Sequence, residues 1–150
     1  MRTFEELLSA HATEIYAYAL RLTGDRDEAD DVFQDTFLAA FRAFGKARDE
    51  HLRAWLYRIA TNKATDRRRR AARLVRLDGL ALAGPSRDGT SLADLAAAVR
   101  VLTKGERAAF LLRRLQDLPY AEVARALGCS EEAARQRVSE ATRKVKEAMR

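Results

Sequence analysis

Apolar residues recur every three or four positions along most of this chain, which is the spacing of amphipathic helices. No stretch alternates polar and apolar residues over the length of a β-strand. Residues that start and stop helices divide the pattern into segments. A first helix is bounded by Thr3 and Gly24, a second by Asp25 and Gly45, and a third follows the loop 46–53 and continues into the basic block 67–70. The pattern predicts an all-α fold.

The helical pattern breaks down after Leu77, where Gly79, Gly84, Pro85 and Gly89 indicate a linker. Ser91 and Thr103 then cap further helices. We therefore expect two small helical domains joined by a flexible linker: an N-terminal domain of three to four helices over residues 1–75, a linker over 76–91, and a C-terminal domain over 92–150. A linker rich in glycine favours loose coupling of the two domains in the free chain. The 18 residues from 76 to 93 can span at most ~60 Å when extended.

The clearest motif is a helical hairpin over residues 117–146. Pro119 is placed as a first helical residue, Gly128 ends the first helix, and Ser130 caps the second. The apolar positions of that second helix are Ala134, Val138, Ala141 and Val145. Its opposite face carries polar side chains that suit the major groove of DNA, namely Glu132, Arg135, Gln136, Ser139 and Arg143. The hairpin indicates a DNA-reading helix-turn-helix; an ordinary hairpin with a solvated outer face is the alternative.

The same spacing predicts which side of the earlier helices is buried. For the second helix this side contains Val32, Phe37, Ala40 and Phe41. For the third helix the core positions are expected at Trp55, Leu56, Ile59, Ala60 and Ala64.

Positive charge is concentrated in one short segment of a chain whose net charge is +6. Residues 51–76 contain nine basic residues and one acidic residue, whereas residues 1–50 contain six basic and eleven acidic residues. Such a basic segment attracts a polyanion, and release of counterions makes the binding strong and salt-sensitive. Nucleic acid is the expected partner.

The basic segment also carries aromatic residues, because Trp55 and Tyr57 lie among Arg53, Arg58 and Lys63. Basic groups hold phosphates, while an exposed aromatic ring can stack on an unpaired base. That combination suits the opening of a duplex. A solvated basic face is the alternative, and Trp55 fits a core position better than a stacking one.

A second polar surface is predicted on the preceding helix. Asp31, Gln34 and Asp35 lie one helical turn apart, next to the apolar side of that helix. An acidic edge of this kind suits a basic helical partner better than it suits DNA. The alternative is a solvent-facing edge of an amphipathic helix.

The composition argues against several other functions. The chain has one cysteine and two histidines, which are far apart in sequence, so neither a metal site nor a disulfide framework is expected. We expect no cofactor, no small-molecule substrate, no membrane association and no enzymatic activity. The first residues lack the apolar block of a secretion signal, which favours a cytoplasmic location.

Three segments together resemble a known family. RLTGDRDEADDVFQDTFLAAFRAF is similar to a polymerase-binding helix, AWLYRIATNKATDRRRR to a promoter-melting helix, and LTKGERAAFLLRRLQDLPYAEVARALGCS to a DNA-binding domain. These are segments of the bacterial RNA polymerase sigma factors of the small, two-domain extracytoplasmic-function (ECF) type. The resemblance covers nearly the whole chain, with the segments in the expected order.

The resemblance implies a non-catalytic specificity subunit that recruits core RNA polymerase to promoter DNA. It assigns Asp31, Gln34 and Asp35 to a coiled coil of the largest catalytic subunit of the polymerase. The residues it assigns to the downstream promoter element and to strand opening are Lys46, Arg48, Arg53, Arg58, Asn62, Lys63 and Arg67. The hairpin residues from Glu132 to Arg143 are assigned to the upstream element. The family also implies an anti-sigma protein as a partner.

The chain departs from the usual family pattern at 133–137, which reads Ala-Ala-Arg-Gln-Arg, so the bases it recognises are not predicted. A free domain of this size is not expected to melt DNA, because flipping a base costs a few kcal/mol. A free-standing helix-turn-helix regulator is the main alternative function. It would have little use for the acidic edge or for the arginine-rich helix.

Overall fold

The computed structural model of the chain describes residues 3–47, 50–78 and 91–149, with side chains in these ranges other than those of 71–78, 91–93 and 96. The described residues form helices and turns and contain no strand, which confirms the all-α prediction. Most of the predicted linker, residues 79–90, lies outside the described residues.

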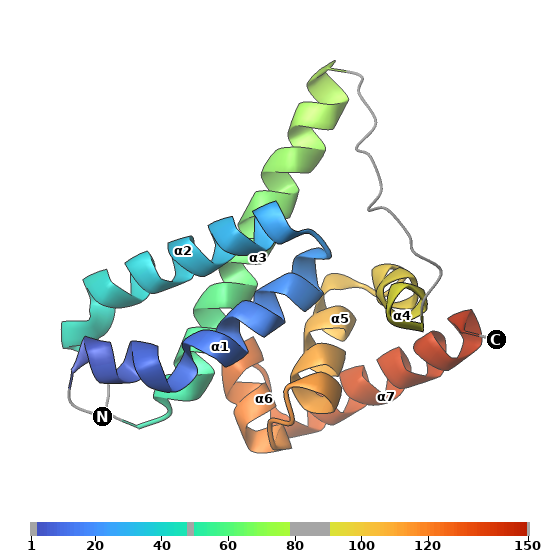
Figure 1. Cartoon of the computed structure of the whole chain (residues 1–150). Helices are drawn as coiled ribbons and strands as arrows, with labels where there is room; N and C mark the ends of the chain where they lie inside the picture. The colour runs from blue at the N-terminus through green and yellow to red at the C-terminus, as the bar shows by residue number, and fades with distance from the viewer. Residues whose placement is uncertain (1–2, 48–49, 79–90, 150) are drawn as a thin grey trace.

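Three helices build the first half of the molecule (Figure 1). They are α1 (Phe4–Thr23), α2 (Arg26–Ala43) and α3 (Leu52–Asp78), and each packs against the other two. A 3-10 turn over Phe44–Lys46 follows α2. The predicted boundary between α1 and α2 is confirmed, because Gly24 takes the left-handed conformation that ends α1, and the Asp25 carboxylate accepts the Glu28 amide to begin α2. The next two boundaries were predicted less well, because α2 ends at Ala43 and not at Gly45, and α3 begins inside the predicted loop 46–53.

The second half contains α4 (Ser91–Arg100), α5 (Lys104–Phe110), α6 (Tyr120–Leu127) and α7 (Glu131–Ala148). A π-helical turn over Leu111–Leu115 extends α5. Thr103 and Glu106 form a complete capping box at the start of α5. Pro119 precedes α6 as its cap, because its ψ of 154° is extended, so the prediction of a first helical residue was wrong by one position.

The predicted helix-turn-helix is present as α6, a turn at Gly128, and α7. Gly128 has a φ of +67°, and the Ser130 hydroxyl accepts the Ala133 amide. The four predicted apolar positions of α7 are all buried, namely Ala134, Val138, Ala141 and Val145. This register leaves the opposite face of α7 to solvent.

The two halves pack against each other, with α6 lying beside α3 (Figure 1). One apolar core runs through both, from Leu56 of α3 to Leu118 and Val123 of the second half. Gln116 lies at this junction and donates to the Glu14 carbonyl at 3.1 Å and to the Tyr57 hydroxyl at 2.8 Å. The two halves are thus packed together, whereas loose coupling was expected. α3 has two buried sides, and the hydrophobic pattern did not distinguish one from the other.

Candidate functional site

The acidic edge of α2 is exposed along one side of the helix. Gln34 is exposed, while Asp31 and Asp35 are half-buried. The sequence predicted a buried aromatic side next to these residues. In the structure, the edge continues into exposed apolar side chains. Leu38 and Phe41, one and two turns further along, are 52% and 63% exposed. The edge therefore begins with carboxylates and ends with two large apolar side chains.

The prediction that Phe41 belongs to the core was wrong. Val32, Phe37 and Ala40 are buried as predicted. At the end of α2, the rings of Phe4 and Phe41 meet edge to face at a centroid distance of 5.2 Å. Exposed apolar residues grouped on one helix are typical of a protein-binding surface.

Arg67 of α3 lies against the acidic edge of α2. Its Nη2 donates to Asp31 Oδ2 at 2.7 Å, its Nε donates to Glu28 Oε2 at 3.0 Å, and its Nη1 lies 3.5 Å from Asp35 Oδ2. The hydrogen bond to Glu28 and the three neighbouring carboxylates raise the pKa of Arg67. A residue predicted to bind DNA is therefore paired with two residues predicted to bind polymerase.

The predicted DNA-contacting residues of α3 do not share one face. At 100° per residue, Arg58 and Asn62 lie on one side of the helix, and Lys63 and Arg67 lie on the opposite side. Arg58 and Asn62 are exposed and line the hollows between α3 and the second half. Lys46 is exposed beyond the end of α2, and Arg48 lies outside the described residues.

Arg53 and Tyr57 belong to a polar network at the junction of the halves. Arg53 Nε and the Tyr57 hydroxyl both donate to Glu14 Oε1, at 2.8 and 2.7 Å. Burial alone would raise the pKa of Glu14, but hydrogen bonds from His11, Tyr57 and Arg53 outweigh it and lower that pKa. Tyr57 is fully buried, so the hypothesis that its ring stacks on a base was wrong. Tyr57 lies on a second buried side of α3, which the sequence pattern did not reveal.

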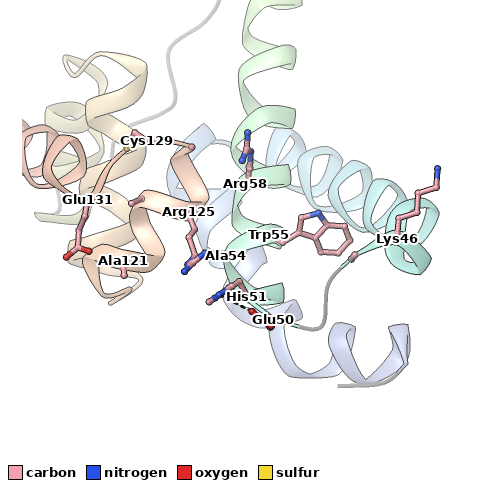
Figure 2. Close-up of a pocket in the computed structure, with 13 residues that line it drawn as sticks. Lys46, Glu50, His51, Ala54, Trp55, Arg58, Ala121, Arg125, Cys129 and Glu131 are labelled. Atoms are coloured by element: carbon pink, nitrogen blue, oxygen red, sulfur yellow. Dashed lines mark ion pairs between the residues drawn. The ribbon is translucent and has the colours of Figure 1, made fainter.

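Trp55 has a different environment from Tyr57. It is half-buried, packs against the core, and also lines a groove of about 750 Å³ between α3 and α6. Figure 2 shows His51, Trp55 and Arg58 on the α3 side of this groove and Arg125 and Cys129 on the α6 side, with the Trp55 ring directed away from Arg125 and toward the side of Lys46. The preference for Trp55 as a core residue is thus only partly confirmed. Arg125 is a basic lining residue that the sequence reasoning missed.

The outer face of α7 gathers the predicted upstream-element residues. All five are exposed and lie on one side of the helix, namely Glu132, Arg135, Gln136, Ser139 and Arg143. Arg135 pairs with Glu131 at 3.1 Å, and Arg143 pairs with Glu140 at 2.9 Å and Glu147 at 3.0 Å. Because these pairs are exposed, water and salt screen them, and a phosphate or a base can replace the carboxylates.

Tyr120 supports this face, although the sequence reasoning did not select it. The guanidinium of Arg135 lies 4.3 Å from the centre of the Tyr120 ring, and that of Arg113 lies 4.7 Å from it. A cation stacked on an aromatic ring is restrained in orientation. The only signal in the sequence was the position of Tyr120 at the start of the first hairpin helix.

The described part of the chain contains neither a membrane-spanning helix nor a cluster of metal ligands. Within it, no helix is both long and apolar enough to cross a membrane. No group of three or more His, Cys, Asp or Glu side chains that could hold a metal ion occurs in the same ranges.

Comparison with known families and proteins gives consistent matches. Residues 7–74 match the family described as Sigma-70 region 2, and residues 92–145 match the family described as Sigma-70, region 4. The chain is 33% identical to the ECF RNA polymerase sigma factor SigE of Mycolicibacterium smegmatis, over 85% of the chain and 54% of SigE. The chain thus spans about half the length of that relative.

Two other sigma factors are matched over most of their length. The RNA polymerase sigma factor CnrH of Cupriavidus metallidurans is 31% identical, over 96% of this chain and 85% of CnrH. A solved structure of the sigma factor RpoE of Bartonella quintana, in complex with the anti-sigma factor NepR, superposes with a TM-score of 0.84. It has 26% identity and covers 99% of this chain and 98% of RpoE. From these matches, this chain belongs to the extracytoplasmic-function sigma factors of the sigma-70 family.

Proposed function

We propose that this protein binds core RNA polymerase and directs it to promoters, acting by binding and without catalysis. The observation that carries the proposal is that one molecule presents separate surfaces of different charge and polarity. An acidic and apolar edge lies on α2, a basic surface lies on α3, and a polar face that carries Arg135, Gln136 and Arg143 lies on α7. Family membership supports the same function. A free-standing regulator does not account for the exposed edge of α2.

The polymerase-binding surface we propose is the edge of α2 from Asp31 to Phe41. Asp31, Gln34 and Asp35 supply polar and acidic groups for a basic coiled coil of the largest catalytic subunit. Leu38 and Phe41 extend the edge with apolar area that becomes buried on docking. Buried aromatic anchors commonly carry most of the binding energy of an interface, which makes Phe41 the main candidate.

For promoter DNA we propose two contact regions. Residues 1–75 act on the downstream element through Lys46, Arg48 and the basic residues of α3, with Arg58, Asn62 and Lys63 at exposed or half-exposed positions. Residues 92–150 act on the upstream element through the outer face of α7. Arginine and glutamine on that face can make bidentate contacts to guanine and adenine. Residues 76–91 join the two parts.

We further propose an anti-sigma protein as a partner and the bacterial cytoplasm as the location. Two similar sigma factors support the first point, because RpoE was solved in complex with NepR, and CnrH with the cytosolic domain of CnrY. The exposed edge of α2 and the groove between α3 and α6 are surfaces that such a protein could cover.

The proposed polymerase-binding surface can be tested by measuring how tightly the variants Phe41→Ala and Val101→Ala bind core polymerase. Both native side chains are 63% exposed, but Val101 follows α4, in the other half of the molecule. We expect Phe41→Ala to weaken core binding by about tenfold or more, as loss of a hot-spot aromatic does. Val101→Ala should bind as the wild type does. Equal affinities of all three proteins would contradict the proposed surface.

A further inference from the structure

Arg67 uses all three guanidinium nitrogens on carboxylates of α2. The partners are Glu28, Asp31 and Asp35, which lie on one side of that helix because they are three and four residues apart. The side chain of Arg67 is 25% exposed, whereas the three carboxylates are 37% to 50% exposed. The cation is therefore the more buried member of each pair, and the carboxylates remain open to an approaching partner.

The neighbouring arginines of α3 differ from Arg67. Arg68, Arg69 and Arg70 are exposed, and in the described part of the chain none of them pairs with a carboxylate. A single helix therefore presents three arginines to solvent and holds a fourth on the acidic edge of the preceding helix. That edge contains Asp31 and Asp35, which belong to the proposed polymerase-binding surface.

We propose that Arg67 is an exchangeable counter-ion that couples polymerase docking on α2 to strand capture on α3. This inference rests on the proposed function. A basic side chain of the polymerase that pairs with Asp31 and Asp35 competes with Arg67 and releases its guanidinium for a phosphate of the opened strand. A phosphate that pairs with Arg67 leaves those carboxylates unpaired and open to the polymerase.

Once polymerase and strand are both bound, Asp31 and Asp35 pair with the polymerase and Arg67 pairs with a phosphate, so each of these three side chains again has a partner of opposite charge. Arginine binds phosphate as readily as carboxylate, with the same two-pronged geometry. If bound polymerase raises the affinity for the strand by some factor, then linkage requires that the bound strand raises the affinity for polymerase by the same factor. Arg67 thus acts on polymerase binding through the carboxylates that it covers, as a positioning residue.

The test measures affinity for core polymerase, in the absence of DNA, for Arg67→Gln and for the matched control Arg68→Gln. Both variants remove one positive charge from adjacent positions of α3. Because Arg67→Gln frees the carboxylates of α2, we expect this variant to bind core polymerase more tightly than the wild type does. The expected increase is about fivefold or more, which is the lower end of typical coupling factors. Arg68→Gln should bind core as the wild type does. A purely structural role for Arg67 predicts weaker binding, so weaker or unchanged binding by Arg67→Gln would overturn the proposal.

Two further measurements complete the test. In the assembled holoenzyme, Arg67→Gln should weaken binding of a single-stranded promoter oligonucleotide; unchanged strand affinity would also overturn the proposal. In an Asp31→Asn, Asp35→Asn background, Arg67→Gln should no longer raise core affinity. If that double variant itself binds core like the wild type, the proposed docking surface fails, which is a separate result from failure of the coupling.

Thermal unfolding followed by circular dichroism shows whether Arg67→Gln folds. Arg67→Lys serves as the second variant, because lysine keeps the charge but lacks the planar guanidinium fork with which Arg67 pairs with the three carboxylates. Arg67→Lys should also raise the affinity for core polymerase, but by less than Arg67→Gln does. The absence of any rise in both variants would exclude the coupling.

Discussion

Gln116 holds the two halves together through groups on two other helices. Its side chain is 8% exposed, donates to the Glu14 carbonyl and the Tyr57 hydroxyl, and accepts a hydrogen bond from Arg21. Arg53 donates to its main-chain oxygen at 3.4 Å. In the sequence, Gln116 stands in a polar turn before Pro119 and has no feature that distinguishes it from a solvated turn residue. Only the docking of the halves gives it a buried role.

We therefore predict that Gln116→Ala destabilises the protein by about 1–3 kcal/mol, because several buried groups lose a partner. The free energy of unfolding, measured by urea denaturation, checks this. Gln136→Ala is the matched control, since Gln136 is exposed on α7, and its stability should stay within about 0.5 kcal/mol of the wild type. A Gln116→Ala variant as stable as the control would show that the network does not hold the halves together.

At the scale of elements, the sequence predicted the helices and their caps well. Gly24, Gly128 and Ser130 act as expected because helix ends depend on local backbone conformation and on one side-chain hydrogen bond. Which side of each helix is covered was harder to predict. Phe41 was expected inside and Tyr57 outside, and both were wrong. Spacing along one helix does not tell how many neighbours that helix has.

The site was predictable to a similar degree. The outer face of α7 follows directly from its apolar stripe, so all five candidate residues were found on one exposed face. The pairing of Arg67 with α2 was not predicted, because it depends on how α2 and α3 cross. The same holds for Arg125 and Tyr120, whose neighbours come from other elements.

The recognition helix gives a prediction of its own. Arg135 stacks on Tyr120 at the exposed face, so we expect Arg135→Ala to lose discrimination at one base pair of the upstream element, worth ~1–3 kcal/mol. Selection of bound fragments from a randomised DNA pool by the holoenzyme measures this. Arg137→Ala is the control, because Arg137 lies on the other side of α7, against Gly105. Identical selected sequences for both variants and the wild type would exclude a base contact by Arg135.

At the scale of the whole molecule, the docked halves are too compact to reach both promoter elements. A 150-residue body has a radius of gyration of about 15 Å and is about 40 Å across. Two contact sites about two helical turns of DNA apart are separated by ~70 Å. The proposed contacts to both promoter elements therefore require the two halves to separate on DNA.

Energy transfer between dyes at Ser9 on α1 and Ala148 on α7, attached in a Cys129→Ser background, measures this separation. Both positions are exposed. We expect high transfer in the free protein and a clear drop when core polymerase and promoter DNA are added. Gln116→Ala should lower the transfer of the free protein as well. Transfer that stays high in the complex would show that the halves remain docked.

The most direct test of the central claim is transcription by core RNA polymerase on a pool of bacterial genomic fragments, with and without this protein, followed by mapping of the transcript 5′ ends. With the wild type, we expect new transcripts that start at discrete sites and share a two-part upstream sequence. Phe41→Ala should reduce these transcripts, and Val101→Ala should not. Transcripts with the same 5′ ends and amounts as core polymerase alone would contradict the proposal that this protein directs initiation.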